Sequence, residues 1–302
     1  MKMEYQALKW EIRENPNNPG EMSIGMLTLN RPDFLNAVDV RMRVELDILC
    51  DEIAHNSNIK VMIITGEGRG FSAGGDLKSE AGPLGAGEED FDFGNFGAYK
   101  EIASLFFNDL RHQVLQRAFK KFEDLPCIVI AAINGPAVGI GLEICTLCDL
   151  RFASDRAKLG EVAVPAGFLP ESGGARNLPK LVGVGKALDM ILTGKIIEAD
   201  EALDIGLVEK VFPHDELLDE TFAYAAQVAS NPYLSVRYAK DLVRMYWNHN
   251  RTDEGWAREF AAIQEITRTG DCREGIRAFL EKREANYRGP YYDNSPWGRG
   301  DK

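Results

Sequence analysis

The chain has 302 residues, of which 45% are hydrophobic and 27% charged, a composition typical of a globular protein with a sizeable core. The formal net charge of −12 argues against nucleic acid or an anionic membrane surface as a partner. There is no apolar run long enough to span a membrane and no signal-peptide core near the start. Together with five cysteines, an odd number, these features predict a protein of the reducing cytoplasm.

The first part of the chain alternates predicted strands and helices. Two strands are expected at 8–14 and 22–30, on either side of a turn-rich segment. A helix is expected over 39–55 with Asp39 as its N-cap, followed by a buried strand at 59–66. The acidic, glycine-rich stretch 79–99 has no regular pattern, which favours an irregular loop near an active site.

The rest of the chain turns increasingly helical. The expected elements are, in order, a helix at 100–124, a buried strand at 127–135, a helix at 139–149, a strand at 150–154, and mostly helix from 172 onward, interrupted at 205–213. Four long helices close the pattern, at 214–229, 232–248, 252–268 and 271–286. The pattern predicts an α/β core over 1–213 and a helical region with a tail over 214–302.

The sequence contains a serine-hydrolase motif, but the predicted strands and helices around it are not those that the motif requires. Residues 70–74 read Gly-Phe-Ser-Ala-Gly, which matches the nucleophile elbow G-x-S-x-G. That elbow requires a strand running directly into it and a helix leaving it. Here the predicted strand ends at Thr65, five residues before Phe71, and glycines follow Ser72. A nucleophilic Ser72 is therefore disfavoured.

Other motifs are incomplete as well. The stretch 182–188 lacks the glycine spacing and the Ser/Thr of a phosphate loop. Cys145 and Cys148 lie in an apolar helix with no second cysteine pair, so they are expected in the core. The four histidines are scattered along the chain, and no metal site is predicted.

Two glycine-rich turns remain, each after a buried strand: one at 68–75 and one at 135–141. Glycine allows a backbone to approach a ligand closely and to present its N–H groups. Two such turns can direct two N–H groups at one oxygen and form an oxyanion hole. The glycines around Ser72 are thus interpreted as a means of presenting backbone.

With these turns the sequence resembles the crotonase superfamily, also called the enoyl-CoA hydratase/isomerase family, over residues 8 to 285. The segments that carry the resemblance are 29–37 (LNRPDFLNA), 68–78 (GRGFSAGGDLK), 126–154, 167–183, 192–211 and 279–283 (FLEKR). The resemblance implies a spiral of repeated strand–strand–helix units, followed by helices that assemble trimers and usually hexamers. It also implies a coenzyme A thioester as substrate, with no further cofactor.

By the same resemblance, the oxyanion-hole donors would be the backbone N–H groups of Gly75 and Ile140, each contributing about 3 kcal/mol to an enolate-like transition state. Ile140 stands where the family usually has glycine. The residues expected to contact CoA are Arg31, Ala73, Asp76, Leu77, Lys78, Lys282 and Arg283, the last two from a neighbouring subunit. Asp33 stands where CoA-binding relatives often carry a basic residue.

The carboxylates distinguish the reactions of the family. The resemblance places one hydratase glutamate at Glu143, whereas the second falls on Ala163 and is missing. Glu161, two residues earlier, would share a face with Ala163 on an extended segment. Glu171 matches an acid found in several family isomerases, and it also suits the N-terminal end of a helix. A buried glutamate has its pKa raised toward neutrality, which suits proton transfer.

The favoured hypothesis is a double-bond isomerase of a CoA thioester that uses Glu143 and Glu171 as its catalytic pair. The first alternative is an enoyl-CoA hydratase that relies on a single glutamate, which would add the mass of water to the product. A second is a carbon–carbon hydrolase of a cyclic β-diketone, which would act without CoA. A binding protein without catalytic activity is the alternative outside enzymes.

Overall fold

A six-stranded sheet forms the centre of the protein in the computed structural model, which describes residues 4–76, 111–248 and 252–288. Its strand order is β1-β2-β3-β4-β6-β9. The strands are β1 (Leu8–Glu14), β2 (Met22–Leu29), β3 (Val61–Gly66), β4 (Ile128–Ile133), β6 (Leu150–Ser154) and β9 (Lys210–Phe212). The β1–β2 pair is antiparallel and the other pairs are parallel. Every residue of β3 is buried, as expected for a parallel strand covered on both faces.

A second, smaller sheet of three short strands gives the fold its spiral path. It consists of β5 (Ala137–Val138), β7 (Lys158–Gly160) and β8 (Ile196–Glu198), in that order. The chain runs from β4 to β5 and then into helix α5 (Ile140–Leu147), and from β6 to β7 and on to helix α6 (Gly174–Val182). This repeated path confirms the predicted α/β spiral, although the short strands themselves were not predicted.

Helices cover both faces of the large sheet. Those before the C-terminal region are α1 (Val40–Ala54), α4 (Arg111–Glu123), α7 (Val184–Thr193) and α8 (Ala199–Asp204), with short 3₁₀ turns η1 (Pro32–Phe34) and η4 (Val164–Ala166). The Asp39 side chain accepts a hydrogen bond from the Met42 amide at 2.8 Å, so the predicted N-cap of α1 is confirmed. The main core extends from α1 and α4 across the sheet to α5 and α7.

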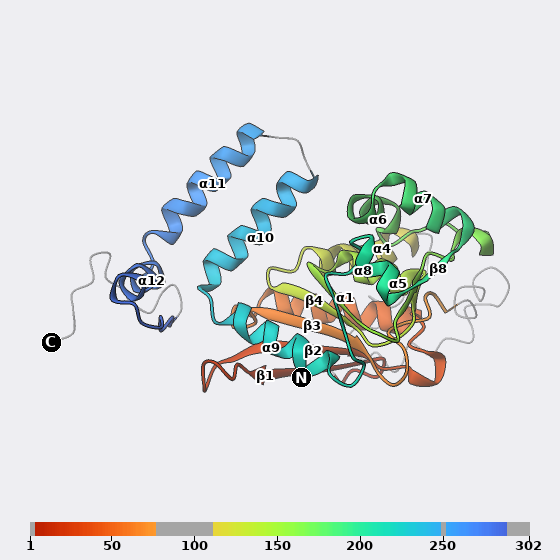
Figure 1. The fold of residues 1–302 in the computed structure, drawn as a ribbon, viewed down its shortest axis with the longest axis horizontal. Coiled ribbons are helices and arrows are strands. Elements are labelled where there is room, and N and C mark those ends of the chain that lie inside the picture. Colours follow the sequence, from red (N-terminus) through yellow and green to blue (C-terminus); the bar gives the residue numbers. More distant parts are fainter. Residues whose placement is uncertain (1–3, 77–110, 249–251, 289–302) are drawn as a thin grey trace.

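The C-terminal helices divide into one that packs on the sheet and three that lie beside the core. They are α9 (Leu217–Ala229), α10 (Tyr233–Asn248), α11 (Thr252–Ile266) and α12 (Gly270–Glu281). Leu217, Ala225 and Ala229 of α9 share a buried cluster with residues of β2, β3, β4 and β6. Figure 1 shows α11 and α12, in blue, extending away from the sheet. Helix α9 therefore packs as part of the core. The domain boundary predicted at residue 213 stays a prediction.

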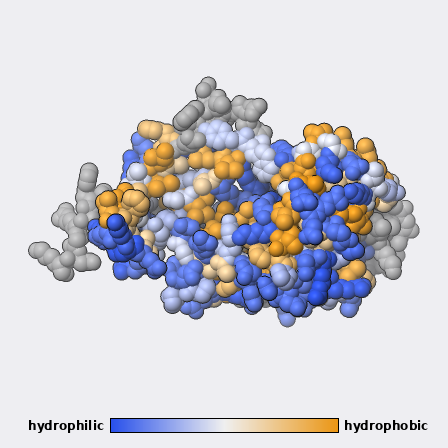
Figure 2. All heavy atoms as spheres, viewed as in Figure 1, coloured by the Kyte–Doolittle hydropathy of each residue, from blue (hydrophilic) through white to orange (hydrophobic). Residues whose placement is uncertain are grey.

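Apolar side chains lie exposed on several of these helices. Phe260 of α11 is 64% exposed, and Phe279 of α12 is 83% exposed. Figure 2 shows further apolar surface on this face of the molecule, over α7 and over the α10–α12 region. The acidic stretch 79–99 and the tail 289–302 lie outside the described residues.

Candidate active site

The two glycine-rich turns predicted from the sequence lie side by side. Gly74 has φ +96° and Gly139 has φ +53°, conformations that L-residues with side chains rarely adopt. A Cβ added to Gly74 would lie 2.8 Å from the Val138 carbonyl oxygen and 3.7 Å from the Ile140 nitrogen. The first turn thus touches the second where α5 begins, and only glycine permits that contact.

Backbone hydrogen bonds join these turns to each other and to β7. The amides of Phe71 and Ser72 donate to the Pro136 carbonyl, each at 3.0 Å, and the Val138 amide donates to the Ser72 carbonyl at 3.1 Å. The Gly139 amide in turn donates to the Gly160 carbonyl at 2.9 Å. Three segments that are distant in sequence therefore meet at the N-terminal end of α5.

Ser72 has a structural role in this arrangement. Its side chain is fully buried, its hydroxyl donates to the Asn36 carbonyl at 2.8 Å, and the same oxygen accepts from the Gly74 amide at 3.2 Å. The hydroxyl thus holds the turn that contains Gly74. These bonds agree with the rejection of Ser72 as a nucleophile.

The backbone amides of Gly75 and Ile140 donate to no other group in the described part of the chain. Ile140 is the first residue of α5, and the first N–H groups of a helix have no acceptor within it. Two unpaired amides on adjacent turns can bind one oxygen that becomes negatively charged. The geometry is therefore compatible with the oxyanion hole predicted at these two residues.

Glu143 lies on α5, one turn after Ile140, and only 1% of its surface is exposed. Its Oε2 accepts hydrogen bonds from the amides of Ser172, at 2.5 Å, and Gly174, at 3.1 Å. Burial raises the pKa of Glu143, and these amides oppose the rise because they favour the ionised form. Among the described residues its polar contacts are with backbone amides, and no arginine or lysine there forms an ion pair with it.

Glu171 lies close to Glu143 but in a more open position. Its side chain is 35% exposed, and one carboxylate oxygen lies 3.8 Å from Nη2 of the buried Arg43. The charge of Glu171 contributes to the raised pKa of Glu143. The structure therefore brings the two predicted catalytic carboxylates into one region, with Glu171 at its exposed side.

Glu161 also lies near Glu143, which the sequence did not predict. It is fully buried, and neither carboxylate oxygen has a hydrogen-bond partner in the described structure. Burial and, to a smaller extent, the charge of Glu143 raise the pKa of Glu161 to about 8, and the Ala163 amide opposes this rise. The extended segment assumed from the sequence ends here, because Ala163 has helical angles and leads into η4.

Because the pKa of Glu161 is raised in the folded protein, we expect the free energy of unfolding to depend on pH. Between pH 4.5 and 8 the unfolded chain releases the Glu161 proton while the folded protein keeps it, so stability falls as the pH rises through that window. One pKa unit corresponds to about 1.4 kcal/mol. We expect Glu161→Gln to be more stable than wild type at pH 8, by a margin that shrinks toward pH 4.5. Urea unfolding of both proteins across this range measures the margin; a margin independent of pH would contradict the prediction.

The residues expected to contact CoA are not all in one place. Ala73 and Asp76 flank the Gly74 turn. Arg31 lies beside them, but its guanidinium is 2.9 Å from Asp76 and 3.2 Å from Asp39, so its charge is already balanced within the chain. Leu77 and Lys78 lie outside the described residues.

Lys282 and Arg283 follow α12, which lies far from α5 in this chain (Figure 1). Arg283 forms ion pairs with Glu274 and Glu281, each at 2.6 Å. Within one chain, these two residues are therefore not part of the region around Glu143.

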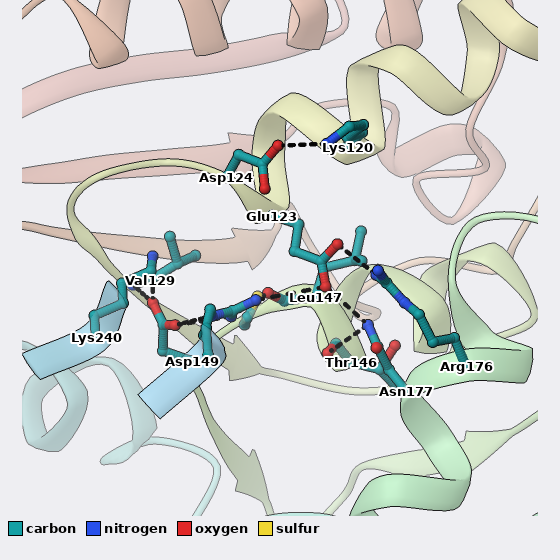
Figure 3. A network of polar contacts seen from close by, with 12 residues as sticks. Lys120, Glu123, Asp124, Val129, Thr146, Leu147, Asp149, Arg176, Asn177 and Lys240 are labelled. Atoms are coloured by element: carbon teal, nitrogen blue, oxygen red, sulfur yellow. Dashed lines mark hydrogen bonds and ion pairs between the residues drawn. The ribbon is translucent and has the colours of Figure 1, made fainter. Parts of the chain in front are cut away.

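An ion-pair network fixes the far end of α5 (Figure 3). Asp149, just beyond α5, accepts from the Val129 amide and from Arg244 of α10, each at 2.8 Å, and its other ion pair is to Lys240, also at 2.8 Å. Glu123 of α4 pairs with Arg176 of α6. Arg244 also lies 3.5 Å from Glu123, so the network joins the end of α5 to α6. Helix α5 carries Glu143 and the first residue of α6 supplies the Gly174 amide, so the network keeps this donor and its acceptor in position.

We expect Asp149→Asn to destabilise the protein by about 3 kcal/mol, because it leaves the buried Lys240 without its counter-charge and leaves Arg244 with only Glu123, at 3.5 Å. The matched control is Asp124→Asn, which removes an exposed pair with Lys120 at 2.9 Å and should cost less than about 1 kcal/mol. Urea denaturation measures both. Equal small losses in the two variants would show that the network contributes little to stability.

No helix in the described part of the chain is long and apolar enough to cross a membrane. Over the same residues, no cluster of three or more His, Cys, Asp or Glu side chains is arranged to hold a metal ion.

Comparison with known proteins identifies the family. The family model described as enoyl-CoA hydratase/isomerase matches residues 20–290. YngF of Bacillus subtilis, named as an enoyl-CoA hydratase/isomerase, is 38% identical over 267 residues, covering 88% of this chain and 95% of its own. The short-chain-enoyl-CoA hydratase of Clostridium acetobutylicum is 35% identical over 265 residues, covering 87% and 94%.

Among solved structures, an enoyl-CoA hydratase from Bacillus anthracis superposes with a TM-score of 0.78 at 32% identity, covering 93% of this chain and 99% of its own. The fold and the paired glycine turns thus belong to an α/β enzyme of the crotonase type. The chain is a member of the enoyl-CoA hydratase/isomerase family.

Proposed function

We propose that the protein adds water to the double bond of a 2-enoyl-CoA thioester, with Glu143 as an acid–base group and the amides of Gly75 and Ile140 holding the thioester oxygen. The observation that carries this proposal is the Glu143 carboxylate, buried and held by two amides, one helical turn after an unpaired amide. Such a group is positioned and desolvated for proton transfer. The hydratase names of several relatives support hydration over the isomerisation favoured from sequence alone.

Isomerisation of the double bond is the second candidate, and Glu171 is the observation in its favour. Its carboxylate is close enough to Glu143 for its charge to raise the pKa of Glu143. Two carboxylates flanking an acyl chain can move a proton from one carbon to another without adding water. Glu171 is partly exposed to solvent and lies beside Arg43. It is therefore less suited than Glu143 to act as a proton acceptor or donor.

The mass of the product distinguishes these reactions. Purified protein would be incubated with 2-enoyl, 3-enoyl, dienoyl and cyclic acyl-CoAs in ¹⁸O-labelled water, and each product analysed by mass spectrometry. Hydration incorporates one labelled oxygen, whereas isomerisation leaves the mass unchanged. Turnover of a cyclic β-diketone without CoA would instead identify a carbon–carbon hydrolase, and the absence of any turnover would contradict both candidates.

The proposal extends to the assembly and the location of the enzyme. We propose a homotrimer or hexamer in the cytoplasm, in which the exposed apolar side chains of α11 and α12 pack against other copies. In that assembly Lys282 and Arg283 would reach the CoA of a neighbouring subunit. Arg31, Lys78 and the backbone around Ala73, Asp76 and Leu77 would contact the CoA bound by their own chain. A monomer in sedimentation at micromolar concentration would contradict the assembly.

A further inference from the structure

Glu161 differs from the other buried carboxylates of the described chain in lacking partners. Glu45 accepts from three backbone amides, and Asp47 is paired with Arg117 and Lys121. Both oxygens of Glu161 are buried, and no residue of the described ranges forms a hydrogen bond with either. A buried polar group left unpaired costs free energy, so its presence calls for a functional explanation.

The position of Glu161 in the spiral suggests that explanation. It directly follows Gly160, the last residue of β7, whose carbonyl accepts from the Gly139 amide at 2.9 Å. Gly139 is the N-cap of α5, the helix that begins at Ile140 and carries Glu143. A Cβ added to Gly139 would lie 3.7 Å from Val162. The segment that carries Glu161 therefore lies against the turn that presents the Ile140 amide.

We propose that Glu161 is a second catalytic carboxyl of this site, the one that carries the proton while Glu143 is ionised. The proposal rests on the proposed function. It assigns to Glu161 the task of the family's second glutamate, for which this chain has Ala163, from a position two residues earlier along the chain.

The hydrogen bonds decide which of the two carboxyls holds the proton. Two neighbouring buried carboxyls do not both ionise readily, so the pair tends to retain one proton. Two amides donate to Glu143 and stabilise its ionised form. Among the described residues only the Ala163 amide favours the ionised form of Glu161, and it does not come within hydrogen-bonding geometry of either carboxylate oxygen. The proton accordingly belongs to Glu161, and burial raises its pKa to about 8.

The two carboxyls then add water across the C2=C3 double bond in one cycle. The Glu143 carboxylate takes a proton from water as the water oxygen bonds to C3 of the enoyl group. The electrons of the C2=C3 bond move toward the thioester, whose oxygen gains negative charge. The enolate then collapses and C2 takes the proton from Glu161. One water has been added, and transfer of the proton from Glu143 to Glu161 restores the starting state.

The test compares Glu161→Gln with wild type on the enoyl-CoA that wild type hydrates. We expect kcat to fall by about 10²–10³-fold with a smaller change in KM. The matched control is Glu198→Gln on β8, the neighbour of β7, whose side chain is 66% exposed; it should retain wild-type activity. A value of kcat within threefold of wild type in Glu161→Gln would overturn the proposal.

Two measurements distinguish a catalytic role of Glu161 from a purely structural one. In wild type, kcat should fall as the pH rises through about 8, and the residual activity of Glu161→Gln should lack that fall. The double variant Glu161→Gln/Ala163→Glu moves the carboxyl to position 163. Its kcat should be at least tenfold higher than that of Glu161→Gln. An unchanged pH profile together with no recovery would show that Glu161 is only structural.

A measurement without turnover keeps this inference distinct from the proposed function. At pH 6, the infrared spectrum of the protein should contain a protonated-carboxyl band that disappears in Glu161→Gln and persists in Glu143→Gln. Absence of that band in wild type would refute the proton assignment even if hydration is observed. Presence of the band without activity on any acyl-CoA would instead reject the proposed function.

Discussion

Replacement of Glu143 by glutamine should lower kcat by about 10²–10⁴-fold and leave the fold intact. Glutamine has nearly the same shape, and its side-chain oxygen can still accept from the amides of Ser172 and Gly174, which hold Glu143 at 2.5 and 3.1 Å. It cannot accept a proton from water. The expected loss is therefore chemical, with binding of the CoA thioester retained.

Steady-state kinetics with the turned-over enoyl-CoA, together with urea unfolding, measure this effect. Glu171→Gln is the informative comparison. If the enzyme is a hydratase, Glu171→Gln should change kcat by less than about tenfold, because the carboxylate is partly exposed and lies by Arg43. Equal large losses in the two variants would favour the isomerase pairing. Full activity in Glu143→Gln would contradict the assignment of the site.

We expect Gly141→Ala to lower kcat by about 10²–10³-fold, comparable to the loss of one oxyanion donor. A Cβ at Gly141 would lie 2.5 Å from the Ser72 carbonyl oxygen and 2.9 Å from the Ser72 Cβ. These atoms belong to the turn that contains Gly75, and they are fixed by backbone hydrogen bonds. Helix α5 must therefore move away, which separates the amides of Gly75 and Ile140.

Gly185→Ala is a closely matched control. Gly185 is the second residue of α7, as Gly141 is of α5, but a Cβ there would meet nothing within 4 Å. Alanine in a helix is favoured over glycine by up to about 1 kcal/mol, so this variant should be active and slightly more stable. Steady-state kinetics measure kcat of both variants, and thermal unfolding measures their stability. Wild-type activity in Gly141→Ala would show that the contact between the two turns is not required.

The large sheet and the long helices follow directly from local patterns. Apolar runs at 59–66 and 127–135 mark β3 and β4, and the N-cap Asp39 marks the start of α1. The small sheet has no such signal. Its strands are two or three residues long, too short for an alternating pattern, and their register is set by stacking on neighbours distant in sequence.

The candidate site was predictable where backbone geometry requires a specific residue. Glycines at 74 and 139 indicated two backbone-presenting turns, and the turns lie in contact. Glu143 was identified by its place in a motif. Glu161 was considered only as a neighbour of Ala163 on an extended segment, whereas the chain turns into η4 at Ala163. The proximity of Glu161 to Glu143 depends on β7 pairing with β5, which is a long-range feature that local sequence does not encode.

The most direct test of the account is whether the two turns polarise a thioester carbonyl. An enoyl-CoA labelled with ¹³C at that carbon would be bound to Glu143→Gln, which holds it without turnover, and the infrared band of the carbonyl recorded. Hydrogen bonds from Gly75 and Ile140 should shift this band to lower frequency than in water, and the shift should shrink when Gly141→Ala is added. A bound thioester with the carbonyl frequency of the free ligand would contradict the oxyanion hole and the proposed chemistry with it.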